Sequence, residues 1–436
     1  MGGISGVYLH NKEVFDTLIQ SSFHLQHRGT ESSAIDTSRS LNSKKIRPGE
    51  VKKVFSEKDA GDFRGDCGVG ALSGGTAELV ELSSSMVDFS LVYDGKLVNS
   101  EKLRVEMKDS GESFSTVFEA ELLGRLISKG EDIIDGIRKM NGKVEGSYTL
   151  GILNDECLYV TRDPYGIMPL VVGENEEGYA FASESPALTE LGFTDFRDVR
   201  PGEILKVSED GVENCGEMDS DRFAHCAFEW MYTARPDSII EGVESTEVRR
   251  RAGMYLARDD YINVDKVGPV PQSGIGYALG YHQESALPYE DFFYLNRFSK
   301  RSYIPSDPEI REQVAKEKLS VIKSSTKGGE IVICEDSIVR GNQLLRLRNT
   351  LKEKGEAKEV HARVGCPPLC SPCPYTQTTK KYSDLIYNQC DGDIGKVSEK
   401  LNLDLLKYNS VENLVEAINL PSEDLCIGCF TDDYPI

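Results

Sequence analysis

The feature that most constrains this chain is the stretch Gly329–Gln343, which reads GEIVICEDSIVRGNQ. Its apolar, β-rich run Ile331–Cys334 predicts a buried parallel strand. The run ends in two acids, Glu335 and Asp336, and a short polar segment then leads into a helix with a leucine-rich face. Backbone amides at such a helix N-terminus favour a phosphate group, and paired carboxylates can hold ribose hydroxyls or a hard cation such as magnesium. The alternative interpretation is an ordinary strand-to-helix turn that happens to carry acids.

The stretch resembles the phosphoribosyl pyrophosphate (PRPP) signature of type I phosphoribosyltransferases, and most closely that of glutamine PRPP amidotransferases, DDSIVRGTT. Glu335 replaces the first Asp of that signature, and Asn342 and Gln343 replace two threonines that help to bind the 5′-phosphate in the family. The resemblance implies that Glu335 and Asp336 are the catalytic acids and share Mg²⁺. It also implies that the following residues bind PRPP: Ser337, Ile338, Val339, Arg340 and Gly341.

Length and charge set broad limits on the function. A chain of 436 residues with 39% hydrophobic content can bury a large core, and its size favours two or three domains. We find no apolar run long enough to span a membrane and no signal peptide, so we expect a cytoplasmic protein without a membrane partner. The formal net charge of −22 argues against a nucleic-acid partner. A local basic pocket can still bind an anionic substrate.

Residues 1–220 are expected to form a strand-rich α/β domain, and the acidic segment Ser208–Asp221 is interpreted as a linker or a domain boundary. Strands are predicted at Phe89–Val92, Ser147–Leu153 and Cys157–Thr161, and helices at Lys12–Ser22 and Phe118–Ser128. The order of motifs resembles the glutaminase half of the amidotransferases, with LQHRGTES, DPYGIMPL, FASES and DVRPGEIL in sequence. The resemblance implies an αββα sandwich of the N-terminal-nucleophile-hydrolase type, followed by a type I phosphoribosyltransferase α/β domain.

The residues that perform glutamine hydrolysis in the family are replaced here. The family's N-terminal nucleophile is a cysteine, and Gly2 stands at that position. Ala71 replaces the arginine that binds the glutamine carboxylate, Asp94 replaces the amide donor of the oxyanion hole, and Glu119 replaces the Asp that holds the substrate amine. Cys67 is internal and lacks a free amine, so it is not expected to take over. We therefore predict a retained fold with a disabled glutaminase.

Residues 221–410 are expected to form the phosphoribosyltransferase domain. Its segment Val267–Tyr281 predicts a strand, a Gly-containing loop and a helix, which is typical of an anion-binding cradle. It resembles the family's pyrophosphate loop, which implies that Ser273 helps to bind Mg²⁺. A basic stretch beginning at Leu295 resembles the loop that closes over PRPP, with these cations facing pyrophosphate: Arg297, Arg301, Arg311 and Lys318. The alternative is a solvated, charged surface loop.

Eleven cysteines in such a chain are expected to be thiols or metal ligands rather than disulfides. Cys226, Cys373, Cys426 and Cys429 match the four ligands of the 4Fe–4S cluster found in one branch of the amidotransferase family. Structural zinc would use the same residue type, so spacing alone leaves both metals open. The last pair lies in a C-terminal tail, residues 411–436, which the cluster would tie to the phosphoribosyltransferase domain.

These observations support three functional hypotheses. In the first, the protein binds PRPP and Mg²⁺ and forms phosphoribosylamine of purine biosynthesis with free ammonia, or with ammonia from a donating protein. In the second, it is a non-catalytic paralogue that senses PRPP or regulates an active enzyme. In the third, it is a phosphoribosyltransferase with another acceptor, to which Asn342 and Gln343 are adapted. The resemblance also implies a homo-oligomer.

Overall fold

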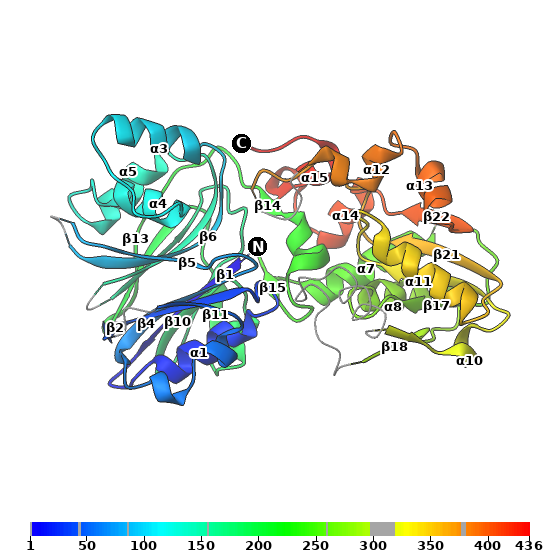
Figure 1. Ribbon diagram of the computed structural model, residues 1–436, viewed down its shortest axis with the longest axis horizontal. Coiled ribbons are helices and arrows are strands. Elements are labelled where there is room, and N and C mark those ends of the chain that lie inside the picture. Colours follow the sequence, from blue (N-terminus) through cyan, green and yellow to red (C-terminus); the bar gives the residue numbers. More distant parts are fainter. Residues whose placement is uncertain are drawn as a thin grey trace.

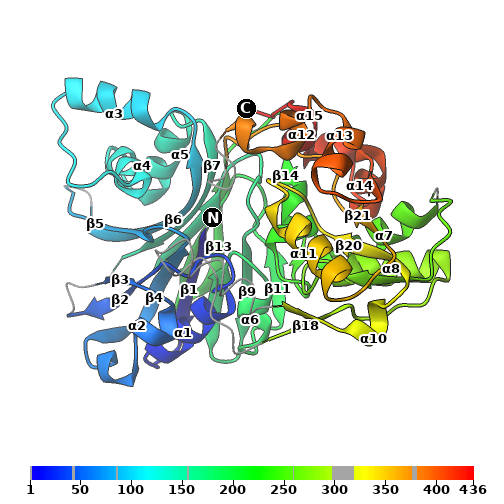
Figure 2. The same cartoon turned by 45° about the vertical axis from the view of Figure 1, so that its right-hand side comes forward.

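The computed structural model describes residues 2–41, 45–84, 87–154, 157–258, 260–296, 319–375 and 381–436. The chain forms two lobes that lie side by side in both ribbon views (Figures 1 and 2). The N-terminal lobe holds both large antiparallel sheets, and the C-terminal lobe holds a smaller parallel sheet.

The N-terminal lobe is an αββα sandwich. Among the described residues, one sheet has the order β11 (Asp195–Asp198), β9 (Val171–Asn175), β10 (Gly178–Ala182), β1 (Gly2–Leu9), β4 (Phe63–Ser73), β2 (Ser32–Ser40) and β3 (Ile46–Pro48). The other has the order β13 (Gly211–Glu217), β12 (Glu203–Ser208), β8 (Leu158–Arg162), β7 (Gly146–Leu153), β6 (Phe89–Leu97) and β5 (Glu78–Leu82). Figure 1 shows α1 (Phe15–His24) outside the first sheet and α3 (Ser100–Asp109), α4 (Glu119–Ile127) and α5 (Ile133–Asn141) outside the second.

Strand β1 shows why the sandwich forms. Ile4 and Tyr8 point into the core between the two sheets, and Val7 and Leu9 point into the core beneath α1. Because successive side chains of a strand face opposite ways, a strand with apolar residues on both faces must be covered on both. The central strand of this lobe is therefore buried along its whole length.

The elements expected in this lobe are found, with one correction. The predicted strands correspond to β6, β7 and β8, and the predicted helices correspond to α1 and α4. The linker interpretation was wrong for Gly211–Glu217, which forms the edge strand β13, paired with β12 through Val207 and Val212. An edge strand that is partly open to solvent can be polar, so its composition resembled that of a linker.

The C-terminal lobe contains a parallel sheet. In the described part of the chain its order is β17 (Lys266–Pro269), β20 (Glu330–Glu335), β21 (Glu359–Val364) and β22 (Leu405–Tyr408). Apolar cores cover both faces of the sheet, which explains the unbroken apolar run before Glu335. The principal helices around it are α7 (Ser245–Arg258), α8 (Ile275–Ser285), α11 (Asn342–Glu353), α13 (Ile394–Lys400) and α14 (Val411–Ile418).

Shorter elements complete the fold. They are α2 (Val51–Val54), η1 (Glu57–Asp59), α6 (Pro186–Thr189), β14 (His225–Cys226), η2 (Glu229–Thr233), β15 (Ile239–Ile240), β16 (Val243–Glu244), β18 (Phe293–Leu295), β19 (Leu319–Val321), α10 (Lys323–Thr326), η3 (Tyr382–Asp384), α12 (Ile386–Gln389), η4 (Ser422–Asp424), β23 (Leu425–Cys426) and α15 (Gly428–Thr431). Strands β18 and β19 pair antiparallel. The predicted loop cations Arg297, Arg301, Arg311 and Lys318 lie outside the described residues.

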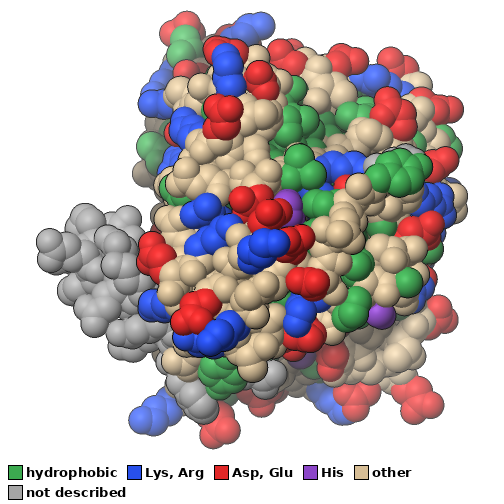
Figure 3. All heavy atoms as spheres, turned by 90° about the vertical axis from the view of Figure 1, so that its right-hand side faces the viewer, with side chains coloured by type: hydrophobic (Ala, Val, Ile, Leu, Met, Phe, Trp, Pro, Cys, Tyr) green, Lys and Arg blue, Asp and Glu red, His purple; other side chains and the backbone are tan. Residues whose placement is uncertain are grey.

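The last residues of the chain pack into the C-terminal lobe. Leu414 and Ile418 of α14 belong to the same apolar core as α7 and α8, and β23 pairs in parallel with β14. Among the described helices, none has the length and apolar character needed to cross a bilayer. The face of this lobe shown in Figure 3 carries acidic and basic side chains side by side.

Candidate functional site

The paired acids lie at the carboxyl end of β20, where it leads toward α11. Glu335 and Asp336 are each only 4% exposed. The Ser273 hydroxyl donates a hydrogen bond of 2.8 Å to Glu335 Oε1, and the Ser337 hydroxyl donates one of 2.5 Å to Asp336 Oδ2. Burial, and then the adjacent charge of Asp336, raises the pKa of Glu335 well above its ordinary value. Two carboxylates held this close form a suitable site for a hard cation.

The loop after β17 approaches these acids through one glycine. A Cβ atom on Gly274 would lie 2.1 Å from the backbone oxygen of Cys334, so only glycine permits this approach. The backbone N–H of Val270 also donates to that oxygen, at 2.8 Å. The contact places Ser273 beside Glu335, and so it brings together two segments that are some sixty residues apart in sequence.

The start of α11 provides the other wall of the site. Gly341 precedes the helix with φ of +76°, a conformation that glycine adopts at little cost. Arg340 pairs with Asp384 at 3.2 Å near the surface. Asn342 and Gln343, at the helix N-terminus, are exposed and face a cavity. Backbone N–H groups of a helix N-terminus in this position suit a phosphate ligand.

The acids, both loops and the cysteines surround one cavity of about 740 Å³. This volume lies within the range of sites that bind small molecules. The sequence predicted about half of the lining residues and missed Glu229, Tyr232 and Asp384, whose place at the cavity depends on tertiary packing. The predicted lining residues are Ser273, Glu335, Asp336, Ser337, Ile338, Val339, Arg340, Gly341, Cys226, Cys373, Cys426 and Cys429.

The structure brings the four predicted cluster cysteines together from three segments. Cys226 and Cys426 are direct partners in the β14–β23 pair, and Cys373 and Cys429 line the same cavity. Burial raises the pKa of the Cys226 thiol well above its ordinary value, and the charges of Cys426, Glu229 and Cys373 raise it further. Within the described ranges, no three His, Cys, Asp or Glu side chains are placed to hold a metal ion.

The chemistry of this donor set fits an iron–sulfur cluster. A single zinc ion binds its sulfur ligands at about 2.3 Å and so requires them to converge on one point. Four thiols around a shared cavity also suit the larger 4Fe–4S cluster, which uses four cysteine ligands. Cys366, Cys370 and Cys390, which were not predicted as ligands, do not line this cavity.

The space around Gly2, which the sequence comparison aligned with the family's nucleophile, is filled by neighbouring atoms. A Cβ atom on Gly2 would lie 2.5 Å from the backbone oxygen of Leu72 and 2.8 Å from Asp94 Oδ1. The cavity beside Gly2 has a volume of about 30 Å³, which suits a group the size of water and is far too small for glutamine. A side chain at position 2 therefore has no room unless the Leu72 backbone or Asp94 moves.

The other replaced positions are buried in the lobe or make hydrogen bonds within it. Ala71 is 1% exposed in the core of β4. Glu119 accepts hydrogen bonds from the Tyr93 hydroxyl at 2.8 Å and from the Leu97 backbone at 3.0 Å. Burial raises the pKa of Cys67 to about 12, so its thiol is protonated and unsuited to nucleophilic attack.

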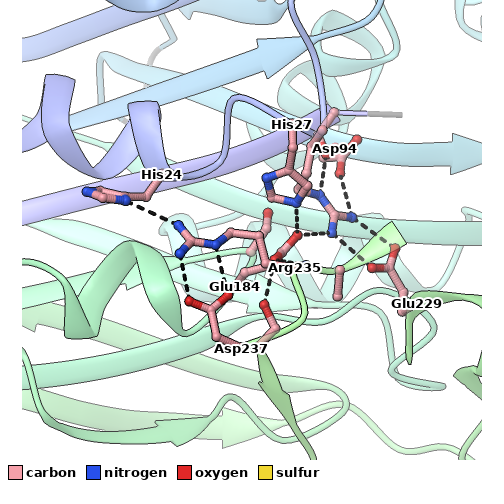
Figure 4. Close-up of polar contacts among 12 residues, drawn as sticks. His24, His27, Asp94, Glu184, Glu229, Arg235 and Asp237 are labelled. Carbon is pink, nitrogen blue, oxygen red and sulfur yellow. Dashed lines mark hydrogen bonds and ion pairs between the residues drawn. The ribbon is translucent and has the colours of Figure 1, made fainter. Parts of the chain in front are cut away.

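A buried guanidinium joins the two lobes beside Gly2. Arg28 donates to the Gly2 backbone oxygen and to Glu184 Oε1, both at 2.7 Å, and makes two 2.9 Å bonds to the Glu229 carboxylate. Figure 4 marks with dashed lines the contacts that reach Glu184 and Glu229. Burial alone lowers the pKa of Arg28, but the charges of Glu229 and Glu184 outweigh it and raise that pKa well above its ordinary value. Because Glu229 also lines the large cavity, the network connects the two sites.

Replacing Arg28 by Met is expected to lower the free energy of unfolding by about 3 kcal/mol, because it leaves Glu184 and Glu229 buried without their shared cation. Denaturant unfolding followed by circular dichroism measures the change. Arg39→Met is the matched control, since its pair with Glu13 is exposed at 3.7 Å and should contribute less than about 0.5 kcal/mol. Equal effects of the two substitutions would show that the buried network is not a stabilising link.

A glutaminase-type αββα sandwich joined to a parallel sheet with paired acids at its carboxyl edge defines an amidotransferase that carries a phosphoribosyltransferase domain. A family model described as a glutamine amidotransferase domain matches residues 80–190. The amidophosphoribosyltransferase of Archaeoglobus fulgidus is 34% identical over 100% of this chain and 98% of its own length, and that of Bacillus subtilis is 30% identical over 99% and 94%. The chain belongs to the amidophosphoribosyltransferase family.

Solved structures agree with this assignment. The glutamine PRPP amidotransferase of B. subtilis, complexed with ADP and GMP, superposes with a TM-score of 0.90 at 29% identity, covering 99% of this chain and 97% of that chain. A structure described as the allosteric regulatory enzyme of purine biosynthesis gives 0.89 at 28% identity, covering 100% and 96%. The predicted family and fold class are therefore confirmed.

Proposed function

We propose that this protein is a phosphoribosyltransferase of purine biosynthesis that binds PRPP and Mg²⁺ and uses ammonia in place of glutamine. The proposal rests on a difference between the two sites of the protein. The cavity at the carboxyl edge of the parallel sheet keeps its acids, its loops and its helix N-terminus, whereas the site at Gly2 has lost both the nucleophile and the room for it. The relatives named amidophosphoribosyltransferase support the reaction class.

In this proposal the nitrogen of ammonia attacks C1 of the ribose, the bond from C1 to the pyrophosphate oxygen breaks, and pyrophosphate leaves with that electron pair. The nitrogen then loses one proton, which gives phosphoribosylamine. Glu335 and Asp336 orient the ribose, and the segment from Ser337 to Gly341 with the N-terminus of α11 receives the 5′-phosphate. Arg297, Arg301 and Lys318 are proposed to face the leaving pyrophosphate.

Mg²⁺ would be held by Glu335, Asp336 and Ser273, and when bound it supplies positive charge for the pyrophosphate oxygens. The 4Fe–4S cluster would be held by Cys226, Cys373, Cys426 and Cys429. Its proposed role is structural, because its ligands would link β14, the segment after β21 and the C-terminal residues around α15.

A direct assay tests the proposal. The anaerobically purified protein is given PRPP and Mg²⁺ with either ammonium or glutamine, and pyrophosphate release is measured. We expect turnover with ammonium alone. Glutamine-dependent turnover would contradict the conclusion that Gly2 occupies the nucleophile position and that the glutaminase is inactive. Binding of PRPP without turnover would favour a non-catalytic PRPP sensor. Turnover only with another nucleophile would favour a different acceptor, since Asn342 and Gln343 face the cavity.

Restoring the cysteine is not expected to restore glutamine hydrolysis. In Gly2→Cys the new Cβ meets the Leu72 backbone oxygen and the Asp94 carboxylate, and the adjacent cavity stays too small for the substrate. Release of glutamate from glutamine should therefore remain at the background level. Gly2→Ala is the matched control, because it introduces the same Cβ without a thiol and should destabilise the protein equally. Glutaminase activity in Gly2→Cys would show that the site is intact apart from its nucleophile.

A further inference from the structure

The small cavity beside Gly2 contains a carboxylate oxygen that lacks a hydrogen-bond partner. Asp94 is 9% exposed and lines this cavity, and among the described residues no donor reaches its Oδ2 atom. A second acid, Glu78, lines the same space. One of its oxygens accepts the Ala120 backbone N–H at 2.8 Å. A buried, unpaired acceptor is costly, so this site is suited to a donor that carries positive charge.

The nearby guanidinium does not satisfy Asp94. Arg28 directs its hydrogen bonds to Gly2, Glu184 and Glu229, and its closest approach to Asp94 Oδ2 is 4.0 Å. In the described part of the network, three carboxylates therefore share this one guanidinium (Figure 4). Asp94 is the most distant of the three from the guanidinium, and it lines the small cavity.

We propose that this remnant of the glutaminase pocket binds one ammonium ion between Asp94 and Glu78. The cavity of about 30 Å³ accommodates a group the size of water, and ammonium has nearly that size. A water molecule would fill the space but would add no positive charge beside Asp94 Oδ2, from which the Arg28 guanidinium lies 4.0 Å away. Ammonium adds one positive charge and four N–H donors, and the polar residues Ser73 and Thr76 also line the cavity.

The site lies near the cavity in which the proposed reaction takes place. Met168 and Tyr375 line the small cavity and belong to an apolar cluster with Cys226, Cys373 and Cys426, which line the large one. One apolar cluster thus contributes to the walls of both cavities. The use of the ammonium site as a source of nucleophile rests on the proposed function, whereas binding itself does not.

Thermal unfolding in the presence of different chlorides tests the binding. At matched ionic strength, ammonium should raise Tm in a saturable way, and potassium and sodium should not. The rise should disappear in Asp94→Asn and in Glu78→Gln, where a neutral amide replaces each acid. Asp66→Asn is the matched control, since this acid on β4 does not line the cavity and should keep the rise. Equal shifts with all three cations, or a shift that persists in the folded variants, would overturn the proposal.

Kinetics provide an independent readout. The KM for ammonium in pyrophosphate release should increase roughly tenfold in Asp94→Asn, with the KM for PRPP unchanged. An unchanged KM for ammonium would overturn the proposal that this site supplies ammonia to the reaction. If Asp94→Asn fails to fold, Glu78→Gln is measured in its place, because its amide oxygen can still accept the Ala120 N–H. Absence of turnover in the parent protein would contradict the proposed function, and the Tm measurements would still decide the ammonium site.

Discussion

Replacement of Cys429 by Ser is expected to remove the visible absorption of the anaerobic protein and to lower its Tm by about 10 °C or more. The reason is that the four thiols come from three separate segments, which the proposed cluster would link, so its binding free energy would also be folding free energy. Iron and sulfide analysis, the visible spectrum and a thermal scan measure the effect.

Cys370→Ser is the matched control for this prediction. Cys370 belongs to the same loop region, and its backbone N–H donates to the Cys429 oxygen at 2.9 Å, but its side chain does not line the cavity. This variant should keep the iron, the colour and a nearly unchanged Tm. A colourless parent protein that contains zinc and no iron would contradict the cluster assignment.

Replacement of Asp336 by Asn is expected to lower the rate of ammonium-dependent pyrophosphate release by about 10²–10³-fold. Asparagine has the same shape as aspartate but no charge, so the site loses one of its two carboxylates while the packing is kept. The KM for Mg²⁺ should rise as well, because carboxylate oxygens bind this ion more strongly than an amide oxygen. Steady-state assays at several Mg²⁺ concentrations measure both effects.

Asp384→Asn provides the comparison. Asp384 lines the same cavity but pairs with Arg340 at 3.2 Å near the surface. Its replacement should change the rate by less than about tenfold, because exposed ion pairs contribute little. Equal losses in the two variants would mean that Asp336 acts only through the general charge of the cavity and not as part of a cation site.

Individual elements show how far the sequence determines the fold. The run Ile331–Cys334 is apolar on both faces, and it forms the buried strand β20 because only a sheet covered on both sides satisfies such a run. The polar strand β13 was missed because an edge strand needs few apolar residues, and its identity depends on pairing with β12. Local composition cannot report that pairing.

The same distinction applies to the sites. The sequence alone determined the residue types at Glu335 and Asp336, the four cysteines and the glycine in place of the nucleophile. Only the tertiary structure shows that the cysteines and the acids surround one cavity. It also shows that Asp94 lies beside Gly2 and that Arg28 binds Glu229 across the lobes. These contacts join residues far apart in the chain, and burial sets their energies. No local sequence pattern encodes the packing that produces this burial.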